Sequence, residues 1–169
     1  WALDGLARLH GDAGRPARVV DLLLDGANLP LDPAPTQEWR RRAAAGALAA
    51  GDAERAGELY RAALRRDAKD VAAVQALVGL AHGDDQLPEL LGLKRRELGL
   101  SDEPARRVAL RLDIARLAGL VEERSGRVEL LLANLDEAPG DDASIDALCD
   151  LLAARSRHAK LADLLAAQA

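Results

Sequence analysis

Residues 2–24 of the chain read ALDGLARLHGDAGRPARVVDLLL, and the apolar pattern of this stretch recurs twice further along the sequence. A shift of 71 residues places Leu3, Leu6 and Leu9 on Val74, Leu77 and Leu80, and a second such shift places them on Ile145, Leu148 and Leu151. No gap is needed at these positions. A fixed internal period is typical of a solenoid, in which each unit buries its apolar face against its neighbours. The sequence therefore predicts a repeat architecture.

The composition favours an all-α protein. The 169 residues are 49% hydrophobic and 30% charged, which is enough apolar material for one domain with a buried core over residues 1–169. The apolar residues are nearly all Ala, Leu and Val, with no Phe and no Met. Ala and Leu are strong helix formers, whereas the aromatic residues that favour strands are scarce.

Net charge and hydropathy limit the classes of function that we expect. A net charge of −5 gives no global basic footprint, so we expect no nucleic-acid partner. No apolar run approaches the roughly 20 residues that cross a bilayer, so we expect no membrane insertion. The chain opens on Trp1 and closes within a helical pattern at Ala169, so we expect a fragment of a longer repeat array. The compartment is undetermined: cytoplasm is favoured, and a periplasmic or exported protein would need a signal upstream.

Apolar residues at spacings of three and four define ten helical blocks. We expect these helices at 2–11, 16–26, 36–50, 53–67, 71–82, 86–99, 103–122, 126–137, 142–154 and 157–168. Short turns join them into five antiparallel hairpins, at about 1–29, 36–69, 70–100, 101–139 and 140–169. The 71-residue period is then a double hairpin. The expected N-caps are Asp70, Asp84 or Asp85, Asp102, Ser125 and Asp142, and the Pro-rich residues 29–35 should form an extended connection.

One hairpin resembles a known repeat. Residues 51–64, GDAERAGELYRAAL, place Ala56 and Tyr60 at the Ala-x3-aromatic spacing of a tetratricopeptide second helix, with Ala63 as the next small residue. A hairpin of about 34 residues also matches the length of that repeat. The chain therefore resembles a divergent tetratricopeptide array, although related two-helix solenoids share these features. The resemblance implies a right-handed α-solenoid whose first helices line a concave groove.

The resemblance also implies where a partner would bind. If the first helices line the groove, the candidate groove residues are Arg8, Glu38, Arg41, Arg42, Gln75, Leu112 and Arg116. The Lys/Asn constellation with which the family clamps a C-terminal carboxylate is not reproduced, because Arg41, Arg42 and Ala45 hold the corresponding places. A preference for acidic peptides rests on those arginines alone.

No catalytic or metal-binding pattern stands out. His10, His82 and His158 lack the spacing of metal ligands, and the lone Cys149 occupies a small-residue packing position. The paired acids Asp84–Asp85, Asp102–Glu103 and Asp141–Asp142 are expected to cap helices. For the arginine clusters we expect ion pairs within one helix, at Glu38–Arg42, Asp102–Arg106 and Glu103–Arg107.

The sequence therefore predicts a non-enzymatic scaffold that binds a protein or peptide in a helical groove and needs no cofactor. One alternative is a structural or spacer segment of a larger assembly, with self-association through further repeats. Another is a helical accessory domain of an enzyme whose catalytic part lies elsewhere. The repeat by itself does not separate these functions.

Overall fold

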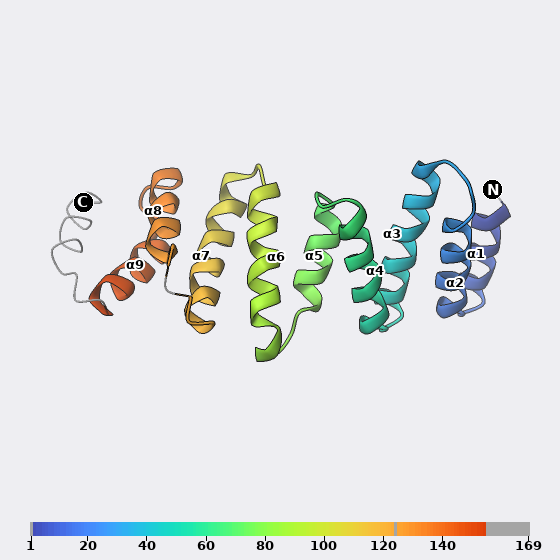
Figure 1. The fold of residues 1–169 in the computed structure, drawn as a ribbon, viewed down its shortest axis with the longest axis horizontal. Coiled ribbons are helices and arrows are strands. Elements are labelled where there is room, and N and C mark those ends of the chain that lie inside the picture. The colour runs from blue at the N-terminus through green and yellow to red at the C-terminus, as the bar shows by residue number, and fades with distance from the viewer. Residues whose placement is uncertain (1, 124, 155–169) are drawn as a thin grey trace. The chain divides into compact units, whose positions relative to one another are not determined.

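The computed structural model describes residues 2–123 and 125–154. This part of the chain contains nine α-helices, one 3-10 turn and no strand, which agrees with the predicted all-α class (Figure 1). The helices are α1 (Ala2–Asp12), α2 (Pro16–Ala27), α3 (Pro33–Ala49), α4 (Ala53–Arg66), α5 (Val71–Leu80), α6 (Leu87–Leu100), α7 (Pro104–Leu120), α8 (Arg127–Glu137) and α9 (Asp142–Ala154). The 3-10 turn η1 spans Asp84–Gln86. The predicted helix at 157–168, with His158, lies outside the described residues.

Three helices begin or end two or more residues from the predicted positions, and one of them is α7, which ends at Leu120 and not at residue 122. Helix α3 begins at Pro33, so the expectation of an extended connection through residue 35 is wrong. Pro33 and Pro35 occupy its first and third positions, where the backbone N–H has no partner within the helix and proline costs little. Helix α5 ends at Leu80, two residues early, and Gly83 then turns the chain with φ of 97°.

One predicted cap, Asp70, is correct, and the cap of α9 lies one residue before the predicted Asp142. The Asp70 carboxylate accepts the Ala73 N–H at 3.0 Å, as expected, and Asp52 accepts the Arg55 N–H at 3.1 Å. Helix α9 is capped by Asp141, which accepts the Ser144 N–H at 3.0 Å, and Asp142 is already helical. An aspartate oxygen bonds best to the N–H three residues later, which selects the first acid of this pair.

Other predicted caps are wrong. Gly126, with φ of 76°, takes the cap position of α8 in place of Ser125. Glu103 takes that of α7 in place of Asp102. Asp84 and Asp85 lie in η1, and α6 begins after them at Leu87. A left-handed glycine at the cap position of α8, and a proline in the first turn of α6 and α7, let these helices begin without a side-chain cap.

The chain divides into two compact units, Trp1–Leu80 and Ala81–Ala169. In unit 1, α1 packs on α2, α2 on α3, α3 on α4 and α4 on α5. The core of unit 1 is lined by small and branched residues, among them Val20, Leu23, Ala43, Ala47 and Ala56. Ala43 and Ala56 have no exposed surface, so the backbones of α3 and α4 approach closely. Trp39 fills the space between α3 and the earlier helices.

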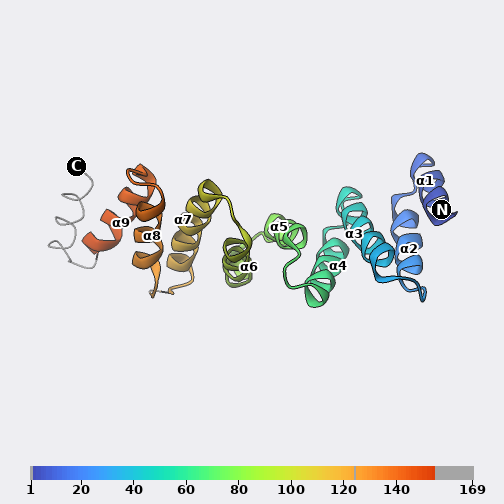
Figure 2. The ribbon, with the colours of Figure 1, turned by 90° about the horizontal axis from the view of Figure 1, so that it is seen from above.

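In unit 2, α7 packs on α6 and α8, and α9 packs on α8 and also touches α7 (Figure 2). Ile114 of α7 faces a cluster with Leu91 and Ala118. Leu131, Leu148 and their neighbours form a second cluster, to which α7 contributes Ala115. Burial of each leucine contributes about 1.5–3 kcal/mol, which holds α7 as the central helix of this unit.

Candidate interaction surfaces

The arginines join neighbouring helices, so the expected ion pairs within one helix are wrong. Arg42 of α3 donates to Asp4 of α1. Arg106 of α7 donates to Glu97 of α6 at 2.6 Å, and the Glu97 side chain is only 2% exposed. Arg107 of α7 donates to Glu137 of α8. A long guanidinium side chain reaches an acid on the next helix, where that acid is less hydrated than an exposed partner one turn away.

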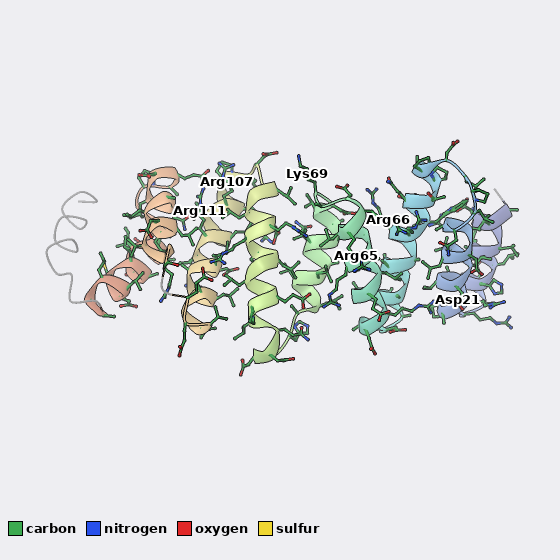
Figure 3. All side chains as sticks on the ribbon, viewed as in Figure 1. Asp21, Arg65, Arg66, Lys69, Arg107 and Arg111 are labelled. Carbon is green, nitrogen blue, oxygen red and sulfur yellow. The ribbon has the colours of Figure 1, made fainter. Side chains whose placement is uncertain are left out.

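Glu137 receives two arginines. Arg107 and Arg111 lie one turn apart on α7 (Figure 3). Both donate to the Glu137 carboxylate, and Arg111 does so at 2.5 Å. The hydrogen bonds from Arg107 and then from Arg111 lower the pKa of Glu137 from 4.5 to about 2. The carboxylate is therefore ionised at all physiological pH values, and it fixes the C-terminal end of α8 against α7.

A buried amide extends this connection to α9. Asn134 has no exposed surface, and its amide nitrogen donates to the Val108 carbonyl at 3.0 Å and to the Ser144 hydroxyl at 2.9 Å. Ser144 is equally buried. Because a buried amide needs its partners, these bonds fix the positions of α7, α8 and α9 relative to one another.

Two open hollows follow one face of α7. The first, about 520 Å³, lies at the N-terminal half of α7 and against the C-terminal end of α8; it is lined by Pro104, Ala105, Val108, Ala109, Leu112, Glu137, Ala138 and Asp141. The second, about 510 Å³, lies between Arg116 of α7, Arg127 of α8 and the face of α9 that carries Ala143, Asp146, Ala147, Asp150, Leu151 and Ala154. Of the predicted groove residues, Leu112 and Arg116 line these hollows. They are four residues apart and so share one face of α7.

The other predicted groove residues lie in unit 1. Arg8 is exposed on α1 in a shallow hollow that Asp4 also lines, and Arg42 binds that same Asp4. Glu38 is exposed on α3 and Gln75 on α5. Arg41 lies 3.6 Å from Asp70. The structure thus pairs Arg42 with Asp4, places Arg8 in the same hollow as that acid, and places Arg41 near Asp70.

Arg41 borders a small cavity that sequence reasoning missed. The cavity, about 30 Å³, lies where the first turns of α3 meet the end of α4 and the turn before α5; it is lined by Gln37, Arg40, Arg41, Ala63, Arg66, Asp67 and Asp70. The arginine pairs at 40–41 and 65–66 are visible in the sequence, but only the packing of α3 on α4 brings Arg40 and Arg66 together.

Residues 2–123 and 125–154 show no cluster of three or more His, Cys, Asp or Glu arranged to hold a metal ion. Cys149 is a half-buried free thiol on α9. His10 lies in the last turn of α1. His82 lies beyond α5, where its backbone N–H donates to the Gln86 side chain at 3.1 Å. None of the helices in the described part is both long and apolar enough to span a bilayer.

Comparison with known proteins identifies the fold. No protein-family model and no curated protein matches the chain. A crystal structure of nearly identical TPR-like repeats from a putative kinesin light chain of Podosopora anserina covers 99% of this chain and 91% of its own, with 19% identity and a TM-score of 0.52. A double mutant of MamA RS-1 covers 96% and 88%, with 14% identity and a TM-score of 0.56. These similarities confirm the predicted solenoid class: the chain has the fold of a tetratricopeptide-like helical repeat.

Proposed function

We propose that this chain is a non-enzymatic scaffold that binds a protein or peptide partner over the two hollows of unit 2. The observation that carries the proposal is the position of these hollows: both follow one face of α7, and together they contain Leu112 and Arg116, two predicted groove residues. Concave surfaces with an apolar part and a few polar groups are the usual places where ligands bind.

The two hollows differ in chemistry. Ala105, Val108, Ala109 and Leu112 make one side of the first hollow apolar. The second hollow is bordered by Arg116 on α7 and by Asp146 and Asp150 on α9, all of them exposed. A partner that fits both would present an apolar side chain followed by charged ones, because each charge in the second hollow can be met only by its opposite.

The hydrogen bonds that connect α7, α8 and α9 support the proposal. Glu137 and Asn134 connect α7 to α8 and α9, so the walls of both hollows belong to one connected set of helices. A surface that is already ordered loses less conformational entropy when a partner binds, which leaves more of the contact energy as affinity.

Site-specific photo-crosslinking tests this proposal. A photoreactive phenylalanine analogue is introduced at Ala109, inside the first hollow, and as a matched control at Leu132, which is 40% exposed and lies outside both hollows. We expect one partner protein to crosslink in cells from position 109 and not from position 132. The substitution Ala109→Arg should weaken binding of that partner about tenfold or more, and Leu132→Arg should not. Equal crosslinking from both positions would refute the proposed surface.

A second candidate function, a building block that contacts copies of itself, is favoured by one observation. Leu6 and Leu9 of α1 are 47% and 67% exposed, whereas the equivalent Leu148 and Leu151 of α9 are buried. Sedimentation velocity distinguishes this function: a concentration-dependent dimer that Leu9→Glu abolishes would support it, and a monomer at all concentrations would exclude it. The groove positions in unit 1, Arg8, Glu38, Arg41, Arg42 and Gln75, stay predictions.

A further inference from the structure

Basic side chains outnumber acidic ones around the small cavity of unit 1. Arg40, Arg41 and Arg66 line it together with Asp67 and Asp70. Arg65 and Lys69, both exposed, add positive charge to the end of α4 and the turn that follows it (Figure 3). The cavity lies within unit 1, where α3 meets the end of α4, and no part of the proposed function uses it.

The two acids of the cavity already have partners. Asp70 caps α5 through the Ala73 N–H at 3.0 Å and lies 3.6 Å from the Arg41 Nε. Asp67 accepts the Lys69 N–H at 2.9 Å, which turns its carboxylate toward the backbone of the α4–α5 turn. The negative charge of Asp70 is therefore shared with Arg41, and neither acid forms an ion pair with Arg40 or Arg66.

The guanidinium groups of Arg40 and Arg66 bring two positive charges to the same cavity. Arg40 is half-buried and donates one guanidinium nitrogen to the Ala27 carbonyl at the end of α2. Within residues 2–123 and 125–154, Arg66 forms no ion pair. Burial, and then the charge of Arg66, lower the pKa of Arg40. Placing two guanidinium groups together costs free energy that an anion between them would recover.

We propose that this cavity is a binding site for the carboxylate of an aspartate or glutamate side chain on a partner protein, held between Arg40 and Arg66. The volume favours a carboxylate: about 30 Å³ accommodates roughly two water-sized atoms, the number of oxygens in a carboxylate, whereas a phosphate group would not be enclosed. Arg65 and Lys69 would then attract further acids beside the bound residue, so the partner segment is acidic.

Titration with defined peptides tests this site. The probe is a fluorescein-labelled decapeptide of glutamate, and a decapeptide of glutamine and a phosphoserine-containing peptide are compared with it by fluorescence anisotropy at fixed salt. Loss of one charged hydrogen-bond donor should weaken binding about tenfold, so we expect this for Arg66→Gln. The matched control is Arg18→Gln, which removes the same charge from an exposed position of α2 in the same unit and should change affinity less than twofold.

A variant that is expected to tighten binding separates an effect on the site from a loss of folding. Asp67→Asn preserves the oxygen that accepts the Lys69 N–H but removes a negative charge from the cavity, so it should tighten binding of the glutamate peptide severalfold. Arginine Nε–Hε NMR signals should shift at Arg40 and Arg66 and not at Arg18. Equal affinity of Arg66→Gln and Arg18→Gln would overturn the proposal, and so would a phosphoserine peptide that binds more tightly than the glutamate peptide.

Discussion

Asn134 is the residue on which unit 2 depends most directly. Its amide bonds to the Val108 carbonyl on α7 and to the Ser144 hydroxyl on α9, while it stands on α8 without exposed surface. A polar group in this position lowers the free energy of the folded unit only because each of its hydrogen bonds is made. It also forces three helices into one relative position, which an apolar side chain of the same size would not do.

Asn134→Ala should therefore lower the free energy of unfolding by about 2–4 kcal/mol, since it leaves a cavity and two buried groups without partners. Ser144→Ala should cost less, because it removes one of the two bonds. Chemical denaturation followed by circular dichroism measures both, and the double variant should cost less than the sum of the two. Asn28→Ala, at an exposed position after α2, is the control. Additive costs would show that the two side chains act separately.

The ion pairs of Glu137 make a pH-dependent contribution to the stability of the folded state. In the folded state, Arg107 and Arg111 lower the pKa of Glu137 to about 2 from its ordinary value of 4.5. The folded state therefore binds this proton less readily than the unfolded state does. The stabilisation is complete above about pH 4.5 and is lost as the pH falls from there to about 2. The melting temperature of Glu137→Gln should thus be lower than that of the wild type at pH 7, with the difference vanishing near pH 2. Glu129→Gln, exposed on the same helix, should show no such trend. A constant difference between pH 7 and pH 2 would contradict the ion-pair explanation.

At the scale of the element, glycines within helices have two opposite roles. A Cβ on Gly26 of α2 would lie 2.3 Å from a Leu3 methyl carbon of α1 and 3.2 Å from the Trp39 ring of α3. Glycine at this position lets α1 and α3 close over α2. Gly92 in α6 has no atom within 4 Å of such a Cβ, so there the missing side chain only increases the conformational entropy of the unfolded chain.

The matched pair Gly26→Ala and Gly92→Ala should shift stability in opposite directions. We expect Gly26→Ala to destabilise the protein by about 1–3 kcal/mol through overpacking, and Gly92→Ala to stabilise it by about 0.5–1 kcal/mol through helix propensity. Thermal melts of the two variants measure both effects. A gain in stability for Gly26→Ala would mean that Leu3 moves aside at no cost and that the close approach is not required.

At the scale of the molecule, each of the two units contains buried apolar clusters. Helices α1 to α5 surround the cluster around Ala43 and Ala56, whereas α7 and its neighbours surround Ile114 and Leu148. In a repeat protein each element stabilises chiefly its neighbours, so a local change need not spread through the whole chain.

Ala56→Leu tests this independence. Ala56 has no exposed surface, and the larger side chain should cost roughly 1–3 kcal/mol in unit 1. Hydrogen exchange followed by mass spectrometry should show amide protection falling about tenfold or more in α2 to α4, while α7 and α8 keep theirs. Ala45→Leu, at an exposed position of α3, should leave both units unchanged. An equal loss of protection in both units would show that the chain unfolds as one cooperative body.

The sequence by itself determined the helices and their apolar sides. The recurrence of Leu6 at Leu77 and Leu148 placed the repeats, and the spacing of Ala56 and Tyr60 marked the second helix of one hairpin, because helical periodicity is a local property. Only the tertiary structure decided which charges meet. Arg106 selects Glu97 and Arg107 selects Glu137, and the cavity beside Arg40 and Arg66 exists only once α3 packs on α4. These partners depend on how each helix is rotated and how it crosses the next, and no pattern within a single helix encodes that geometry.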